Sequence, residues 1–225
     1  MKRIFLKLIR FIILIIVVLI VIKGAYSLGI IQKKLDLSTI YIDAGHGGYD
    51  SGAVGYNGNY EKDISLQLAL VIGDKLKENG FNVIYTRVDD NIPKFNKEID
   101  DLRWRTNKAN RTNAGIFLSI HLNAFEDSEA NGIETWYRKE HLEGEALSKI
   151  VQENLVNVGY GKDRGLKSTE KKSIYVLNRA HAIPVLIEFG FITNQSDCEK
   201  LMSREVQEKI GESIVNSLKE YLKDK

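Results

Sequence analysis

Two histidines, His46 and His121, are the residues of this chain whose type and setting best suit catalysis. His46 closely follows the apolar segment 40–44, and His121 directly follows the apolar segment 116–120. Enzymes built on a central sheet place their reactive groups at such strand ends, and the chain has only four histidines. Two histidines and one carboxylate are a common ligand set for catalytic Zn²⁺. The pair therefore indicates a metal site, with hydrogen-bonded structural histidines as the alternative.

Five acids near these segments are candidates for a third ligand. Glu188 is the most conspicuous, because it lies in the apolar segment 184–191, where a carboxylate is costly to bury unless it is paired or metal-bound. A strand-end carboxylate that caps a neighbouring loop is the alternative. The short zinc motif with two histidines one helical turn apart is absent from the sequence, so spacing alone does not choose among the acids. The candidates are Asp43, Asp50, Glu61, Glu134 and Glu188.

The elements that must position these residues follow from the hydrophobic pattern. Strand-like and helix-like segments alternate, which predicts one α/β domain over residues 38–225. We expect a mixed, largely parallel central sheet flanked by helices. A Gly-rich loop at 43–60 separates the first strand from the first helix. The predicted strands are 38–43, 81–86, 116–120, 132–137, 173–177 and 184–189, and the predicted helices are 61–79, 97–112, 144–158 and 204–222.

The N-terminal region has the pattern of a membrane signal. Phe11–Ile22 is an unbroken run of twelve apolar residues, and four bases precede it. This pattern is typical of an export signal whose basic end stays in the cytoplasm. Twelve residues suit a cleaved signal peptide, whereas snorkelling of Lys7 and Arg10 would lengthen the segment towards a retained anchor. We expect residues 1–27 to be a signal peptide or membrane anchor, residues 28–37 to be a connector, and the rest to be exported.

The formal net charge of +2 hides an uneven distribution. Residues 1–27 carry five bases and no acids, and the remainder carries 27 bases against 30 acids, a net charge of −3. A slightly acidic domain has no electrostatic footprint for nucleic acid. The single cysteine, Cys198, excludes an intramolecular disulfide.

Several segments match, in order, the motifs of a known family. The first is Asp-Ala-Gly-His-Gly-Gly-Tyr-Asp-Ser-Gly-Ala at 43–53, and a later one is Ser-Ile-His-Leu-Asn-Ala at 119–124. Over residues 38–222 the chain resembles the zinc-dependent N-acetylmuramoyl-L-alanine amidases with a catalytic domain of the Amidase_3 type. Its short N-terminal segment on a bare catalytic domain further resembles the sporulation amidases that help to make muramic lactam in the spore cortex. The other matching segments are Glu61-Lys62, Thr86-Arg87 with Asp89, Leu102-x-x-Arg105-x-x-x-Ala109-Asn110, Gly132-Ile133-Glu134, Arg164-Gly165-Leu166-Lys167, Val176-Leu177 and 184–194.

The resemblance implies a Zn²⁺ site formed by His46, Glu61 and His121, with Glu188 as the catalytic glutamate. It implies hydrolysis, through zinc-activated water, of the amide between the N-acetylmuramoyl lactyl group and L-alanine of the peptidoglycan stem peptide. These four positions carry the family's residues, whereas residues 94–101 are extra relative to the family pattern. Two alternatives stay open: a membrane-tethered peptidoglycan-binding protein without activity, and a zinc carboxypeptidase acting on stem peptides.

The expected partners are peptidoglycan, as substrate, and the membrane, through the N-terminal segment, with no nucleic acid. We expect the protein at the extracytoplasmic face of the cell membrane, or secreted to the cell wall or spore cortex. The sequence shows no cell-wall-binding repeat and no extra helix that could plug the cleft. Because an unrestrained wall hydrolase is hazardous, we expect control by expression timing or by a regulatory protein partner. Arg105 and Arg164 have two open interpretations, binding of peptide carboxylates and pairing with acids of the fold.

Overall fold

The computed structural model describes residues 2–27, 34–223 and 225, which divide into the units Met1–Leu35 and Asp36–Lys225. The first unit contains helix α1 (Lys2–Ser27), over the expected signal or anchor. Of the expected connector, residues 28–33 lie outside the described residues. The described part of the chain contains no helix with the length and hydropathy of a membrane crossing.

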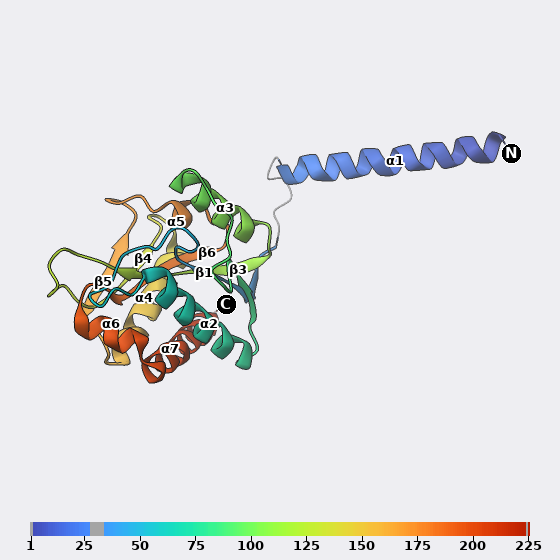
Figure 1. The fold of residues 1–225 in the computed structure, drawn as a ribbon. Coiled ribbons are helices and arrows are strands. Elements are labelled where there is room, and N and C mark those ends of the chain that lie inside the picture. Colours follow the sequence, from blue (N-terminus) through green and yellow to red (C-terminus); the bar gives the residue numbers. More distant parts are fainter. Residues whose placement is uncertain (1, 28–33, 224) are drawn as a thin grey trace. The chain divides into compact units, whose positions relative to one another are not determined.

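The second unit is an α/β domain built on one mixed sheet (Figure 1). Among the described residues the sheet has six strands in the order β2-β1-β3-β6-β4-β5. The β1–β2, β1–β3, β3–β6 and β4–β5 pairs are parallel, and only β4–β6 is antiparallel. The predicted mixed, largely parallel sheet is therefore confirmed. The strands are β1 (Asp36–Ala44), β2 (Asn82–Tyr85), β3 (Ala114–Asn123), β4 (Ile133–Tyr137), β5 (Asp163–Ser168) and β6 (Ile183–Phe191).

Helices cover both faces of the sheet, because alternate residues of its central strands point in opposite directions. In β1, Ile40 and Ile42 enter a large core shared with α2, α4 and α7. Tyr41 enters a smaller core shared with α3 and α5, where its ring stacks on Phe117 with centroids 5.8 Å apart. Figure 1 shows α3 and α5 on the opposite side of the sheet from α2 and α7. The helices are α2 (Glu61–Glu78), α3 (Glu98–Asn110), α4 (Leu142–Asn157), α5 (Tyr175–Arg179), α6 (Gln195–Met202) and α7 (Arg204–Leu222).

One local sequence prediction is wrong, and one strand has no counterpart among the predicted elements. The segment 173–177 is predicted as a strand, but Tyr175 begins the short helix α5. Val176 and Leu177 are buried in the smaller core, so tertiary packing overrides the local preference. Strand β5 was not predicted, because its sequence Asp-Arg-Gly-Leu-Lys-Ser has little apolar periodicity. It lies at the sheet edge and pairs only with β4 among the described strands.

Candidate metal centre

The candidate site lies at the carboxyl ends of three parallel strands. Because β1, β3 and β6 are parallel neighbours, their ends meet at one edge of the sheet, where α/β proteins place their ligands. His46 lies two residues beyond β1, and His121 lies near the end of β3. Glu188 of β6 is the register partner of His121. Glu61, the first residue of α2, completes the group.

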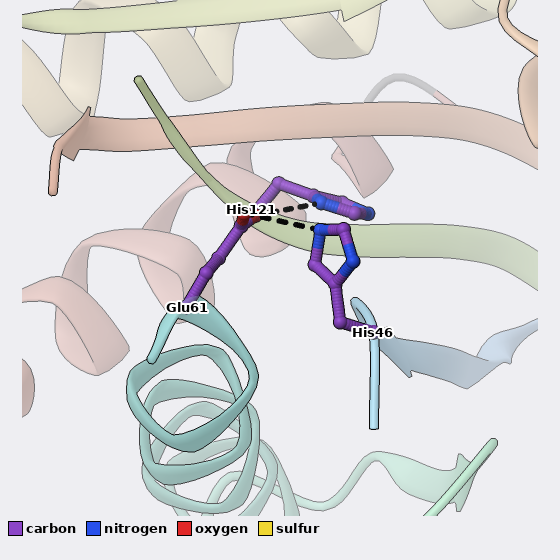
Figure 2. Close-up of side chains that lie close together, drawn as sticks. All are labelled: His46, Glu61 and His121. Atoms are coloured by element: carbon purple, nitrogen blue, oxygen red, sulfur yellow. Dashed lines mark hydrogen bonds and ion pairs between the residues drawn. The ribbon is translucent and has the colours of Figure 1, made fainter. Parts of the chain in front are cut away.

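The side chains of His46, Glu61 and His121 converge (Figure 2). His46 Nε2 lies 3.1 Å from Glu61 Oε2, and His121 Nδ1 lies 3.0 Å from Glu61 Oε1. One ligand atom from each residue lies within 4.8 Å of the others, and no other such group of three occurs in the part of the chain that the structure describes. Zinc–nitrogen bonds of about 2.0–2.1 Å place neighbouring tetrahedral ligands about 3.3 Å apart. Donor types and spacing therefore fit Zn²⁺ with a coordination position left open.

Two of the other candidate acids form ion pairs with Arg105 and Arg164. These pairs decide between the two interpretations of the arginines. Asp43 Oδ1 accepts a hydrogen bond from Arg105 Nη1 at 3.0 Å, and both side chains are buried. Glu134 Oε2 accepts from Arg164 Nε at 3.1 Å. Both arginines thus pair with acids of the fold. Glu61 is the acid whose carboxylate lies between the histidines, a choice that sequence spacing left open.

Glycine is required where the Gly-rich loop approaches the cluster. His46 itself has φ +58°, an uncommon conformation for a non-glycine residue that is found at functional sites. A Cβ on Gly45 would overlap the imidazole of His121. A Cβ on Gly52, whose φ is +63°, would lie 2.7 Å from His46 Cδ2 and 2.8 Å from Glu61 Cβ. Because glycine has no side chain, the loop can pass close to the candidate ligands.

Asp50 orients the His46 ring through the nitrogen that faces away from Glu61. Its Oδ2 lies 2.7 Å from His46 Nδ1, which leaves Nε2 directed at Glu61. A carboxylate behind a ligating histidine fixes its tautomer and raises its basicity. In the metal-free site, burial lowers the pKa of His46, but the bonds with Asp50 and Glu61 outweigh it and raise the pKa to about 10. Burial raises the pKa of Glu61, but its bonds with His121 and His46 hold it well below its usual value. The site therefore favours positive charge, as a cation site must.

Two buried arginines hold the backbone that carries His46. Arg87 donates from Nε to the carbonyl of Ala44 at 3.1 Å and from Nη2 to that of Gly45 at 2.7 Å. Arg105 donates to the carbonyls of Ala44 at 2.9 Å and His46 at 2.6 Å. Three consecutive carbonyls are thus bound by cations that cannot be deprotonated. Sequence reasoning missed this function of Arg87, because no local pattern reports which carbonyl a side chain reaches.

Glu188 lines the same cavity as the metal cluster, a space of about 370 Å³. Its Oε2 is buried and has no hydrogen-bond partner among the described residues. Burial raises the pKa of Glu188 to about 7, although His121 opposes the shift, and the negative charges of Glu61 and Glu134 add to it. A buried carboxyl that titrates near neutrality can both accept and donate a proton.

Comparison with known proteins identifies the family of this chain. Residues 40–220 match the family model described as N-acetylmuramoyl-L-alanine amidase. The chain belongs to that family. As a member, it is a cell-wall amidase that cleaves peptidoglycan. Its cluster of His46, Glu61 and His121 is the group in this amidase that could bind a metal.

Relatives of this amidase cover most of its length. The uncharacterized protein YqiI of Bacillus subtilis is 42% identical over 192 residues, which are 84% of this chain and 87% of YqiI. The germination-specific N-acetylmuramoyl-L-alanine amidase of Bacillus subtilis is 34% identical over 198 residues, covering 83% of this chain and 80% of its own. The CwlD amidase of Clostridioides difficile, solved in complex with the GerS lipoprotein, has a TM-score of 0.77 and 36% identity. That similarity covers 83% of this chain and 99% of CwlD.

Proposed function

We propose that this amidase hydrolyses the amide between the N-acetylmuramoyl lactyl group and L-alanine, with Zn²⁺ held by His46, Glu61 and His121. One observation carries the proposal: the partner-free, buried oxygen of Glu188 lines the same cavity as three convergent metal-ligand atoms. A carboxyl group with no structural bond at that oxygen is free to exchange a proton with a reacting molecule.

Each residue has a distinct part in the proposed reaction. When bound, Zn²⁺ supplies Lewis acidity, which polarises a carbonyl and brings the pKa of water towards about 7. Glu188 accepts a proton from the attacking water and then donates it to the departing amide nitrogen of L-alanine. A pKa near 7 suits both transfers, because the group is then neither too weak a base nor too weak an acid at neutral pH. Asp50 and Arg105 hold the His46 side chain and backbone in position.

The reaction is tested with zinc-loaded full-length protein and purified muropeptides. We expect a free lactyl carboxyl group and a new N-terminal L-alanine, and we expect loss of both products on chelation and in Glu188→Gln. Glu208→Gln on α7 is the matched control. Shortened stem peptides would instead identify a carboxypeptidase. Stoichiometric zinc without any product would identify a non-catalytic peptidoglycan-binding protein.

We also propose that the enzyme is exported and that residues 1–27 act as a signal peptide or membrane anchor. The basic residues before the apolar run Phe11–Ile22 support this proposal. Fractionation of cells, with mass spectrometry of the protein's N-terminus, distinguishes the outcomes. An intact N-terminus in the membrane fraction indicates an anchor, a new N-terminus near residue 28 indicates cleavage, and intact protein in the cytosol contradicts export.

A role in the spore cortex, with formation of muramic lactam, is the proposed biological setting. It is supported by the 34% identity to a germination-specific amidase. A regulatory protein partner is proposed as well, since the similar CwlD amidase was solved in complex with the GerS lipoprotein. Deletion of the gene should remove muramic lactam from cortex muropeptides, and normal lactam content would contradict the cortex role. Co-purification of tagged protein from sporulating cells tests for a partner.

A further inference from the structure

Lys172 is a cation of the active-site cavity, and no carboxylate of the described residues forms an ion pair with it. It lies between β5 and α5 and lines the cavity that contains the metal cluster and Glu188. Its Nζ lies 5.6 Å from the centroid of the Trp136 ring, a cation–π contact that retains the charge. Arg105, the other lysine or arginine in the cavity lining, is already bound by Asp43 and Asp101.

Acidic side chains gather in one part of the cavity wall. Asp50, Glu98 and Asp101 line the part that the cavity shares with a neighbouring one of about 400 Å³. Lys172 lines only the first cavity, on the side that also contains Glu188. An anionic group on a substrate is repelled near the shared acidic wall and attracted near Lys172. The positive charge of Lys172 opposes the rise in the pKa of Glu188 that burial causes.

The substrate carries a group of matching chemistry. The residue after L-alanine in a peptidoglycan stem is a glutamate linked through its side chain, so its α-carboxyl is a free acid in some walls and an amide in others. One residue spans about 3.3–3.6 Å, so this group lies within about 10 Å of the bond that is cut. Only the free acid can form an ion pair with an ammonium group.

We propose that Lys172 binds this free carboxylate and makes the enzyme prefer a glutamic acid to its amide at the second stem residue. The inference depends on the proposed amidase function, because it places the stem peptide on the Lys172 side of the metal cluster. A partly exposed ion pair discriminates by about fivefold. Raised salt should reduce this preference, since the lysine is exposed to solvent.

The test uses zinc-loaded full-length protein and two muropeptides that differ only in this carboxyl or amide group. Wild type is expected to cleave the acid with a kcat/KM about fivefold above that of the amide. In Lys172→Gln this ratio should fall to near one, and Lys172→Arg should restore it. Lys171→Gln removes the same charge from the same loop but does not line the cavity, and it should keep the ratio. Lys97→Gln, in the neighbouring cavity, should keep it as well.

Three outcomes overturn the inference: equal cleavage of both peptides by wild type, an unchanged ratio in Lys172→Gln, or loss of the preference in Lys97→Gln. Inhibition of wild type by the product dipeptides is a second measurement, which reports binding and requires no variant. The dipeptide acid should inhibit wild type more strongly than the amide, and equally strong inhibition also contradicts the inference. Failure to cleave either peptide while zinc is bound would instead refute the proposed amidase function.

Discussion

Replacing Glu188 with glutamine is expected to reduce catalysis strongly and, at alkaline pH, to stabilise the metal-free protein. In the fold the pKa of Glu188 is raised by burial from 4.5 to about 7. The folded state therefore binds this proton more tightly than the unfolded state does. The resulting stabilisation is complete below a pH of about 4.5 and is lost as the pH rises through about 7. Glutamine does not ionise, so the variant avoids this loss.

A rise in the pKa of Glu188 from 4.5 to about 7 corresponds to about 3 kcal/mol. Between pH 4.5 and pH 8, the stability of Glu188→Gln relative to wild type should rise by up to about this amount. The assay is urea unfolding of residues 34–225 with a chelator present, because a bound cation would favour the ionised carboxylate. Parallel stability curves for the two proteins would refute the burial of an ionisable carboxyl. The zinc-loaded variant should lose about 10²–10⁴-fold in kcat, and near-normal kcat would refute its role as the base.

Three further predictions concern the support of the metal ligands. Gly52→Ala should weaken zinc binding at least about tenfold, since its Cβ would meet His46 and Glu61, whereas Gly58→Ala has a similar positive φ but no neighbour within 4 Å and should not. Competition with a chromogenic chelator measures both, and equal affinities would contradict the argument. Asp50→Asn should reduce zinc affinity about 10–100-fold by the same assay, and an unchanged affinity would show that His46 needs no carboxylate behind it. Arg87→Met should destabilise the domain by about 2–4 kcal/mol in urea unfolding, because it leaves buried carbonyls without donors; a change below about 1 kcal/mol would contradict this.

Long periodic segments were predictable from the sequence. The closing helix was predicted at 204–222, where α7 is found, and the predicted helix 61–79 differs from α2 by one residue. Such segments carry their signal locally, because burial of one face requires an apolar residue at each helical turn. The short helix α5 and the edge strand β5 were not predictable in this way. Their conformations depend on packing and pairing with distant segments.

The sequence by itself determined the residue types that can do the chemistry, the strand ends that carry the two histidines, and the family to which the motifs belong. Spacing alone left the third ligand open and the family resemblance implied Glu61; the tertiary structure places its carboxylate beside both histidines, reaching His121 across 60 positions of sequence. It also decided that Arg105 binds backbone and acids of the fold, whereas Lys172 keeps a free charge in the cavity. Periodicity and motifs report what a residue is and which face it occupies. The partner of a charged side chain depends on distances between segments, and only the folded chain sets those distances.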